Sequence, residues 1–159
     1  MMSERETQGG GCQCGAVRFR VKLLGRPSIC HCRMCQKAFG GFFGPLVTTH
    51  DAAWTRGEPK WFQSSNSARR GFCGDCGTPL AYETRFGLEL AIGAFDDPAV
   101  AAPVIQVNPN DRVPFFDHLT SLPVRTEVSD DWRDFMAGIH SNQHPDHDTD
   151  DWPPRGSEG

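Results

Sequence analysis

The sequence predicts a mainly β fold whose strands are predominantly antiparallel. Residues 15–24 alternate between apolar and basic side chains, with the period of two that is typical of a strand with one buried face. The 159 residues include 17 Gly and 12 Pro, which favours many turns and argues against a helical bundle. Gly, Pro, Asn or Asp separates most of the short apolar segments, so we expect short connections between neighbouring strands.

The first strand is expected over residues 15–24. Its apolar face carries Val17, Phe19, Val21 and Leu23, and its polar face carries Arg18, Arg20 and Lys22. Further short segments with strand-like composition predict strands at 44–48, 60–64, 68–73, 79–83, 88–93 and 104–107.

One helix is expected near the C-terminus, within the segment "SDDWRDFMAGIH". Ser129 can cap its N-terminus, and the first turn that follows is acidic. Its apolar face is formed by Trp132, Phe135, Met136 and Ile139. We expect this face to pack on the sheet; the alternative is a helix that binds a partner. Residues 7–140 are therefore predicted to form one domain, and the polar, acidic residues 141–159 a disordered tail.

The charge distribution disfavours two classes of partner. The net charge of −4 lies in the tail, which leaves 15 acidic and 15 basic residues in 1–140. No Lys/Arg block appears, so neither nucleic acid nor an acidic membrane surface is expected as a partner. The polar N-terminus lacks the apolar core of a secretory signal, and no apolar run reaches the ~18 residues of a membrane span. We expect a soluble, cytoplasmic protein.

Seven cysteines lie in three short groups, at "CQC", "CHCRMC" and "CGDC". Cytosolic thiols stay reduced, so clustered cysteines indicate metal binding or catalysis more often than disulfides. The seven divide most naturally into four and three. Cys12, Cys14, Cys73 and Cys76 would form a closed, structural four-thiolate zinc site, in which Gly15 and Gly77 allow left-handed turns.

The remaining three, Cys30, Cys32 and Cys35, would leave a zinc ion with an open fourth position, which is the arrangement of catalytic zinc. His31 is a rival fourth ligand, although it should point away from its two neighbours in an extended segment. A ligand from elsewhere in the chain, or an iron–sulfur cluster, is a further alternative. Because three thiolates weaken zinc as a Lewis acid, the site should favour a soft thiolate as its fourth ligand and chemistry on sulfur.

The motifs "GGCQCGAVRF", "CHCRMCQKAFG", "FCGDCGTPL", "GAFDDP" and "PFFDHLTSLP" span roughly residues 9–123 in order. In these the chain resembles the glutathione-dependent formaldehyde-activating enzyme family. The resemblance implies an Mss4-like sandwich of short strands around two zinc sites. It gives the structural ligands as Cys12, Cys14, Cys73 and Cys76, and the catalytic ligands as Cys30, Cys32 and Cys35.

The implied reaction is the addition of glutathione to formaldehyde, or a similar small aldehyde, to give S-hydroxymethylglutathione, formally a carbon–sulfur lyase run in reverse. Because glutathione has two carboxylates, its pocket should offer cations. The candidates are Arg33, Lys37, Arg69 and Arg70, each of which could instead be solvated surface. The alternative function is a non-enzymatic zinc module that binds another protein.

Overall fold

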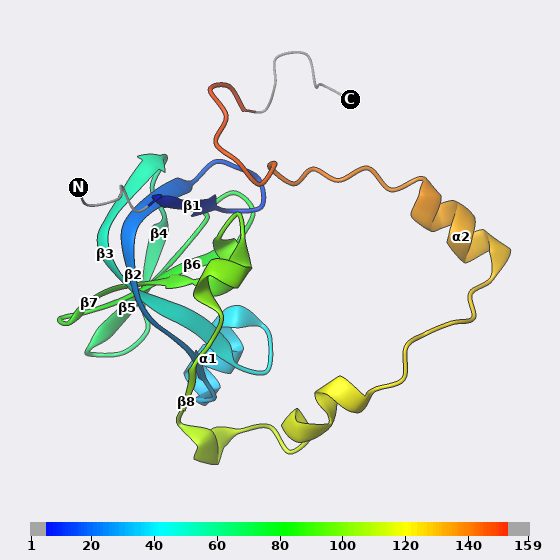
Figure 1. The fold of residues 1–159 in the computed structure, drawn as a ribbon, viewed down its shortest axis with the longest axis horizontal. Helices are drawn as coiled ribbons and strands as arrows, with labels where there is room; N and C mark the ends of the chain where they lie inside the picture. Colours follow the sequence, from blue (N-terminus) through cyan, green and yellow to red (C-terminus); the bar gives the residue numbers. More distant parts are fainter. Residues whose placement is uncertain (1–5, 153–159) are drawn as a thin grey trace.

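The computed structural model describes residues 6–152, and a single curved sheet dominates it (Figure 1). The strands follow one another in the order β1-β2-β3-β7-β6-β5-β4, all antiparallel, and β8 pairs in parallel with β2. Their bounds are β1 Gln8–Gly11, β2 Arg18–Cys30, β3 Gly44–Arg56, β4 Lys60–Gln63, β5 Ala68–Phe72, β6 Pro79–Thr84, β7 Gly87–Ala91 and β8 Ile105–Val107. The predicted mainly β, antiparallel fold is confirmed.

The strands β2 and β3 are the longest, and each runs beyond the strand predicted for it. Both contain 13 residues, whereas the sequence predicts strands at 15–24 and 44–48. An irregularity between Leu24 and Pro27 interrupts the alternation of β2, yet the pairing with β3 resumes afterwards and continues to Cys30. A bulge of this kind keeps a strand paired in its sheet but interrupts the alternation of apolar and polar residues from which a strand is predicted.

Side chains of β2, β3, β6 and β7 contribute most of the core, together with residues that follow β7. Val17, Phe19 and Val21 are buried as predicted, whereas Leu23 lies beyond the core and is 41% exposed. Strand β1 was missed because it is rich in glycine. A Cβ at Gly10 would lie 2.4 Å from the Ala94 carbonyl oxygen, so this position needs glycine to allow the close approach of the two backbones.

The structure contains a short helix, α1 (Arg33–Phe39), that the sequence did not predict. Cys32 caps its N-terminus, and Gly40 ends it in the left-handed conformation at φ 62°. Four 3-10 helices connect the later elements: η1 Ile92–Ala94, η2 Pro98–Ala101, η3 Pro109–Asp111 and η4 Phe116–Ser121. Within the described part of the chain, no helix is long and apolar enough to cross a membrane.

The C-terminal helix, α2 (Asp130–Ala137), forms where predicted, with Ser129 as its N-cap. The expectation that it packs on the sheet is wrong. None of its residues is buried, and its apolar side chains Trp132, Phe135 and Met136 are 41–60% exposed. Figure 1 shows why: the chain after β8 leaves the sheet, carries α2 at a distance from it, and returns.

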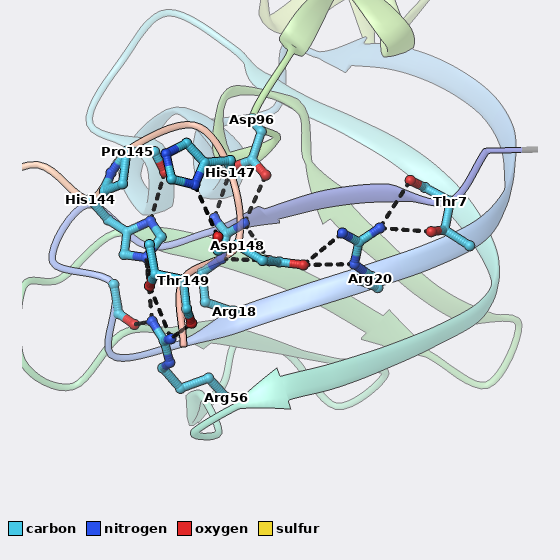
Figure 2. A network of polar contacts seen from close by, with 11 residues as sticks. Thr7, Arg18, Arg20, Arg56, Asp96, His144, Pro145, His147, Asp148 and Thr149 are labelled. Carbon is cyan, nitrogen blue, oxygen red and sulfur yellow. Dashed lines mark hydrogen bonds and ion pairs between the residues drawn. The ribbon is translucent and has the colours of Figure 1, made fainter. Parts of the chain in front are cut away.

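The predicted disordered tail is anchored where the structure describes it. We call residues 144–152 the C-terminal latch; residues 153–159 lie outside the described range. The His144 N–H donates to the Gln13 carbonyl oxygen at 2.7 Å, and His144 is 4% exposed. Asp148 accepts hydrogen bonds from Arg18 and Arg20 of β2 (Figure 2). Acidic composition suggests disorder, but two arginines of β2 give this carboxylate a binding site.

The charge of Asp148 stabilises the latch, so we expect Asp148→Asn to lower the free energy of unfolding by about 1 kcal/mol near pH 7. Hydrogen bonds from Arg18 hold the pKa of Asp148 below its ordinary value of 3.8. The contribution is therefore complete above that value and is lost as the pH falls through the lower, folded-state pKa. Urea unfolding of wild type and variant between pH 7 and about pH 3 should show the difference shrinking with acid.

The matched control is Asp146→Asn, which changes an exposed latch carboxylate that forms no ion pair with any described residue. An equal loss of stability in both variants would contradict the assignment.

Candidate metal centre and cleft

The seven cysteines form two separate clusters, divided as the sequence predicts. The four-cysteine cluster is Cys12, Cys14, Cys73 and Cys76, and the three-cysteine cluster is Cys30, Cys32 and Cys35. Within each, all sulfur atoms lie within 4.8 Å of one another, so each could hold a metal ion.

The four-cysteine cluster is built from two tight turns. Gly15 and Gly77 each follow a cysteine and each adopt φ +80°, the left-handed conformation expected of them. A hydrogen bond from the Gln13 N–H to Thr78 Oγ1 joins the turns at 2.9 Å. A hydrogen bond from the Gly15 N–H to the Cys12 carbonyl oxygen folds "CQC" into a turn.

The spacing of these sulfurs fits zinc. The Cys12 and Cys14 sulfurs are 3.6 Å apart, and those of Cys14 and Cys73 are 3.8 Å apart. A tetrahedral site with Zn–S bonds of ~2.3 Å has edges of about 3.8 Å. Burial raises the pKa of Cys14 to about 12, whereas hydrogen bonds involving Thr78 outweigh burial at Cys76 and lower its pKa to about 6. A cation would stabilise all four as thiolates.

The three-cysteine cluster lies where β2 passes into α1. Cys30 ends the strand, Cys32 caps the helix, and Cys35 lies in its first turn. The Cys35 N–H donates to Cys32 Sγ at 3.4 Å. Asn108 Nδ2 donates to Cys30 Sγ and Arg70 Nη2 donates to Cys35 Sγ, both at 3.3 Å. Each sulfur therefore accepts a hydrogen bond, which suits thiolates rather than thiols.

Burial and hydrogen bonding act differently on two of these thiols. Burial raises the pKa of Cys35 to about 12, although the Arg70 guanidinium opposes this. At Cys32, hydrogen bonds from Cys35 and Cys30 and the charge of Arg70 outweigh burial, so the pKa lies below its ordinary value. The buried Arg70 guanidinium favours the thiolate forms of Cys32 and Cys35, and a bound cation would favour them further.

Among residues 6–152, no histidine, aspartate, glutamate or fourth cysteine completes the three-cysteine cluster. His31, the rival fourth ligand, points away from the cluster, as its position between Cys30 and Cys32 predicts. Its Nε2 hydrogen-bonds with Gln106 Oε1 at 2.8 Å, and its ring packs edge-on against Phe116. The cluster thus has three protein sulfurs and an open side.

That open side faces a cleft of about 310 Å³, on the face of the sheet opposite to that of Val47 and Leu90. Alternate residues of β2 and their partners on β3, β7, β6 and β5 form its floor. The lining residues are Arg26, Ser28, Cys30, Cys32, Met34, Cys35, Leu46, Thr48, Arg70, Tyr82, Glu89, Val107 and Asn108.

Of the four cations predicted to contact substrate, Arg70 lines the cleft and three do not. Arg33 donates to Gln36 Oε1 at 2.7 Å, and Lys37 is exposed on α1. Arg69 lies on the opposite face of β5, where it pairs with Glu83 at 2.6 Å. The cleft is also lined by residues that were not predicted from the sequence: Arg26, Tyr82, Glu89 and Asn108. Strand alternation shows which residues share a face, but only the pairing register brings separate strands together here.

Comparisons with known proteins agree with this architecture. The sequence profile described as glutathione-dependent formaldehyde-activating enzyme matches residues 7–110. A crystal structure of a Rhodobacter sphaeroides protein is similar, with a TM-score of 0.50 and 23% identity over 62% of this chain and 99% of the other. At this identity the likeness concerns the fold. A search of curated proteins found no match.

Substitution of His31 tests whether this residue supports the fold or binds a metal ion. We expect His31→Ala to lower the free energy of unfolding by about 2 kcal/mol or more, because it leaves a cavity among aromatic rings and removes a buried hydrogen bond. Metal content per chain should equal that of wild type. Urea unfolding and elemental analysis would measure both, and loss of one metal equivalent would make His31 a ligand.

Proposed function

Because the chain belongs to the glutathione-dependent formaldehyde-activating enzyme family, we propose that it adds the thiol of glutathione to formaldehyde or a similar small aldehyde, forming S-hydroxymethylglutathione. The observation that carries this proposal is the open side of the three-cysteine cluster, which faces a cleft large enough for a thiol substrate. A closed cluster, as in the alternative of a non-enzymatic module, would need a fourth ligand that residues 6–152 do not offer.

We propose zinc for both clusters. Cys12, Cys14, Cys73 and Cys76 would hold a structural ion, and Cys30, Cys32 and Cys35 would hold the ion that takes part in the reaction. Zinc bound to the three-cysteine cluster supplies acidity, because a thiol that coordinates it is deprotonated at neutral pH.

The protein's own residues orient the reactants and balance their charge. Arg70 and Asn108 fix the sulfurs of Cys35 and Cys30 through the hydrogen bonds described above. Tyr82 lies in the same cleft, with the Arg70 guanidinium 4.8 Å from its ring centroid. Burial raises the pKa of Tyr82, so its hydroxyl keeps its proton and can donate to the aldehyde oxygen.

In this addition the substrate sulfur forms a bond to the aldehyde carbon, and the electron pair of the C=O π bond moves to oxygen. Negative charge therefore develops on the oxygen toward which Tyr82 Oη can donate. The thiol proton leaves to water, and the product oxygen takes up a proton, so no redox partner is needed.

The reaction is tested with Cys32→Ser, which keeps a side chain able to cap α1 while replacing one thiolate. We expect adduct formation from glutathione and formaldehyde to slow by about 100-fold or more, toward the uncatalysed rate. The measurement compares the two proteins at equal zinc loading of the four-cysteine cluster, with circular dichroism to establish equal folding. Identical rates, neither faster than the uncatalysed reaction, would refute the enzymatic function.

Metal removal separates the two clusters. We expect about two zinc ions per chain, of which a mild chelator removes one without unfolding, because three ligands and an open side release a metal more readily than four. Removal of the second should unfold the domain, since a structural zinc site contributes ~10–16 kcal/mol. Elemental analysis and circular dichroism during a chelator titration would follow both steps. Simultaneous loss of both ions would contradict this division.

A further inference from the structure

A row of polar side chains crosses the floor of the cleft, perpendicular to the strands. Arg70 pairs with Tyr82, Tyr82 with Glu89, and Glu89 with Thr48, across β5, β6, β7 and β3. Directly paired residues project to the same face of a sheet, and all four line the cleft. The row begins beside the three-cysteine cluster, where Arg70 donates to Cys35 Sγ.

Arg26 occupies the other end of the row, and the bulge in β2 places it there. Its backbone N–H donates to Thr48 Oγ1 at 2.7 Å. The neighbouring Gly25 permits this approach, because a Cβ there would lie 2.1 Å from the same oxygen. Bulges commonly redirect a side chain next to a functional site, and here Arg26 lines the cleft together with Glu89.

Glu89 and Arg26 are a carboxylate and a guanidinium whose charges have not been neutralised by direct contact. Neither side chain forms an ion pair or hydrogen bond with another residue in 6–152. Glu89 is half-buried, and burial raises the pKa of its carboxyl while the charge of Arg26 lowers it. An unpaired, half-buried carboxylate is costly, so a cationic ligand group placed beside it would stabilise the site.

We propose that Glu89 and Arg26 bind the zwitterionic α-amino acid group of a γ-glutamyl thiol, Glu89 contacting the ammonium and Arg26 the carboxylate. The pair matches this group in charge, and both side chains are free to receive it. This inference rests on the proposed function, since it takes the substrate to be a thiol that reacts at the three-cysteine cluster. It identifies the part of the thiol substrate that Glu89 and Arg26 would recognise.

The spacing selects a long thiol over a short one. Glu89 lies two strands from Arg70, a separation of roughly 10 Å at the usual strand spacing. In a γ-glutamyl-cysteinyl compound the sulfur and the α-nitrogen are about eight covalent bonds apart, which also extends to roughly 10 Å. In free cysteine the same atoms are separated by about three bonds and reach only ~4 Å. Cysteine could therefore not span from the cluster to Glu89.

The test measures binding by titration calorimetry, using zinc-loaded full-length protein. The ligands are S-methylglutathione and its glutaryl analogue, which lacks only the α-ammonium. We expect Glu89→Gln to weaken binding of S-methylglutathione about tenfold and to leave the already weaker binding of the glutaryl analogue unchanged. Arg26→Met should weaken both ligands, because both retain the carboxylate.

Glu83→Gln and Lys22→Met are the matched controls. Glu83 is a carboxylate on the opposite face of the sheet, one residue from Tyr82, and Lys22 is an exposed cation of β2. Both variants should bind as wild type does. Equal weakening of the two ligands by Glu89→Gln, no weakening, or no binding by wild type would overturn the inference.

Reaction rates with 2-mercaptoethanol, which has no zwitterion, distinguish this inference from the proposed function. If wild type accelerates no thiol–aldehyde addition but binds S-methylglutathione in a Glu89-dependent way, the proposed reaction fails and the binding assignment stands. If it accelerates addition of both thiols while Glu89→Gln leaves binding intact, the reaction stands and the binding assignment fails.

Discussion

The pairing register of the sheet determines where the strand residues on the floor of the cleft lie. Val47, Leu90 and Ala81 form one cross-strand row and are buried in the core. The adjoining row projects to the opposite face and carries Tyr82 and Glu89 into the cleft. Because side chains alternate with a period of two, a slip of one residue in β7 would replace Glu89 with a leucine and expose core residues. Burial of the apolar row therefore also fixes the position of the polar row.

The two ends of the cleft depend on local departures from regular strand structure. At one end the chain leaves β2 and turns into α1, so that Cys32 serves as helix cap and Cys35 follows one turn later. At the other end a bulge directs Arg26 toward Thr48. A regular strand could not bring three sulfurs together over six residues, because successive side chains point to opposite faces and Cys35 would face away from Cys30 and Cys32. These departures separate the end of the cleft that carries the three cysteines from the end that carries Arg26.

The sequence was informative where physical signals are local. Spacing and the glycines after Cys14 and Cys76 indicate tight turns, and alternation locates most strands, because each depends on a few neighbouring residues. Helix α1 was missed because a seven-residue helix carries little periodic signal and depends on its caps and packing. The cleft carboxylate Glu89 was missed because its relation to Arg26 depends on the pairing of β2, β3 and β7. Strand propensity contains no information about register.

The C-terminal latch connects the far end of the chain to the four-cysteine cluster. His144 and Trp152 pack over Gly15, where a Cβ would lie 2.4 Å from the His144 ring. The glycine that allows the cysteine turn thus also leaves room for the latch, and Trp152 Nε1 donates to the Cys14 carbonyl oxygen. Opening this turn would remove the surface on which the latch rests. The chain carrying α2 is consequently held at both ends, by β8 and by the latch, although no residue of α2 itself is buried.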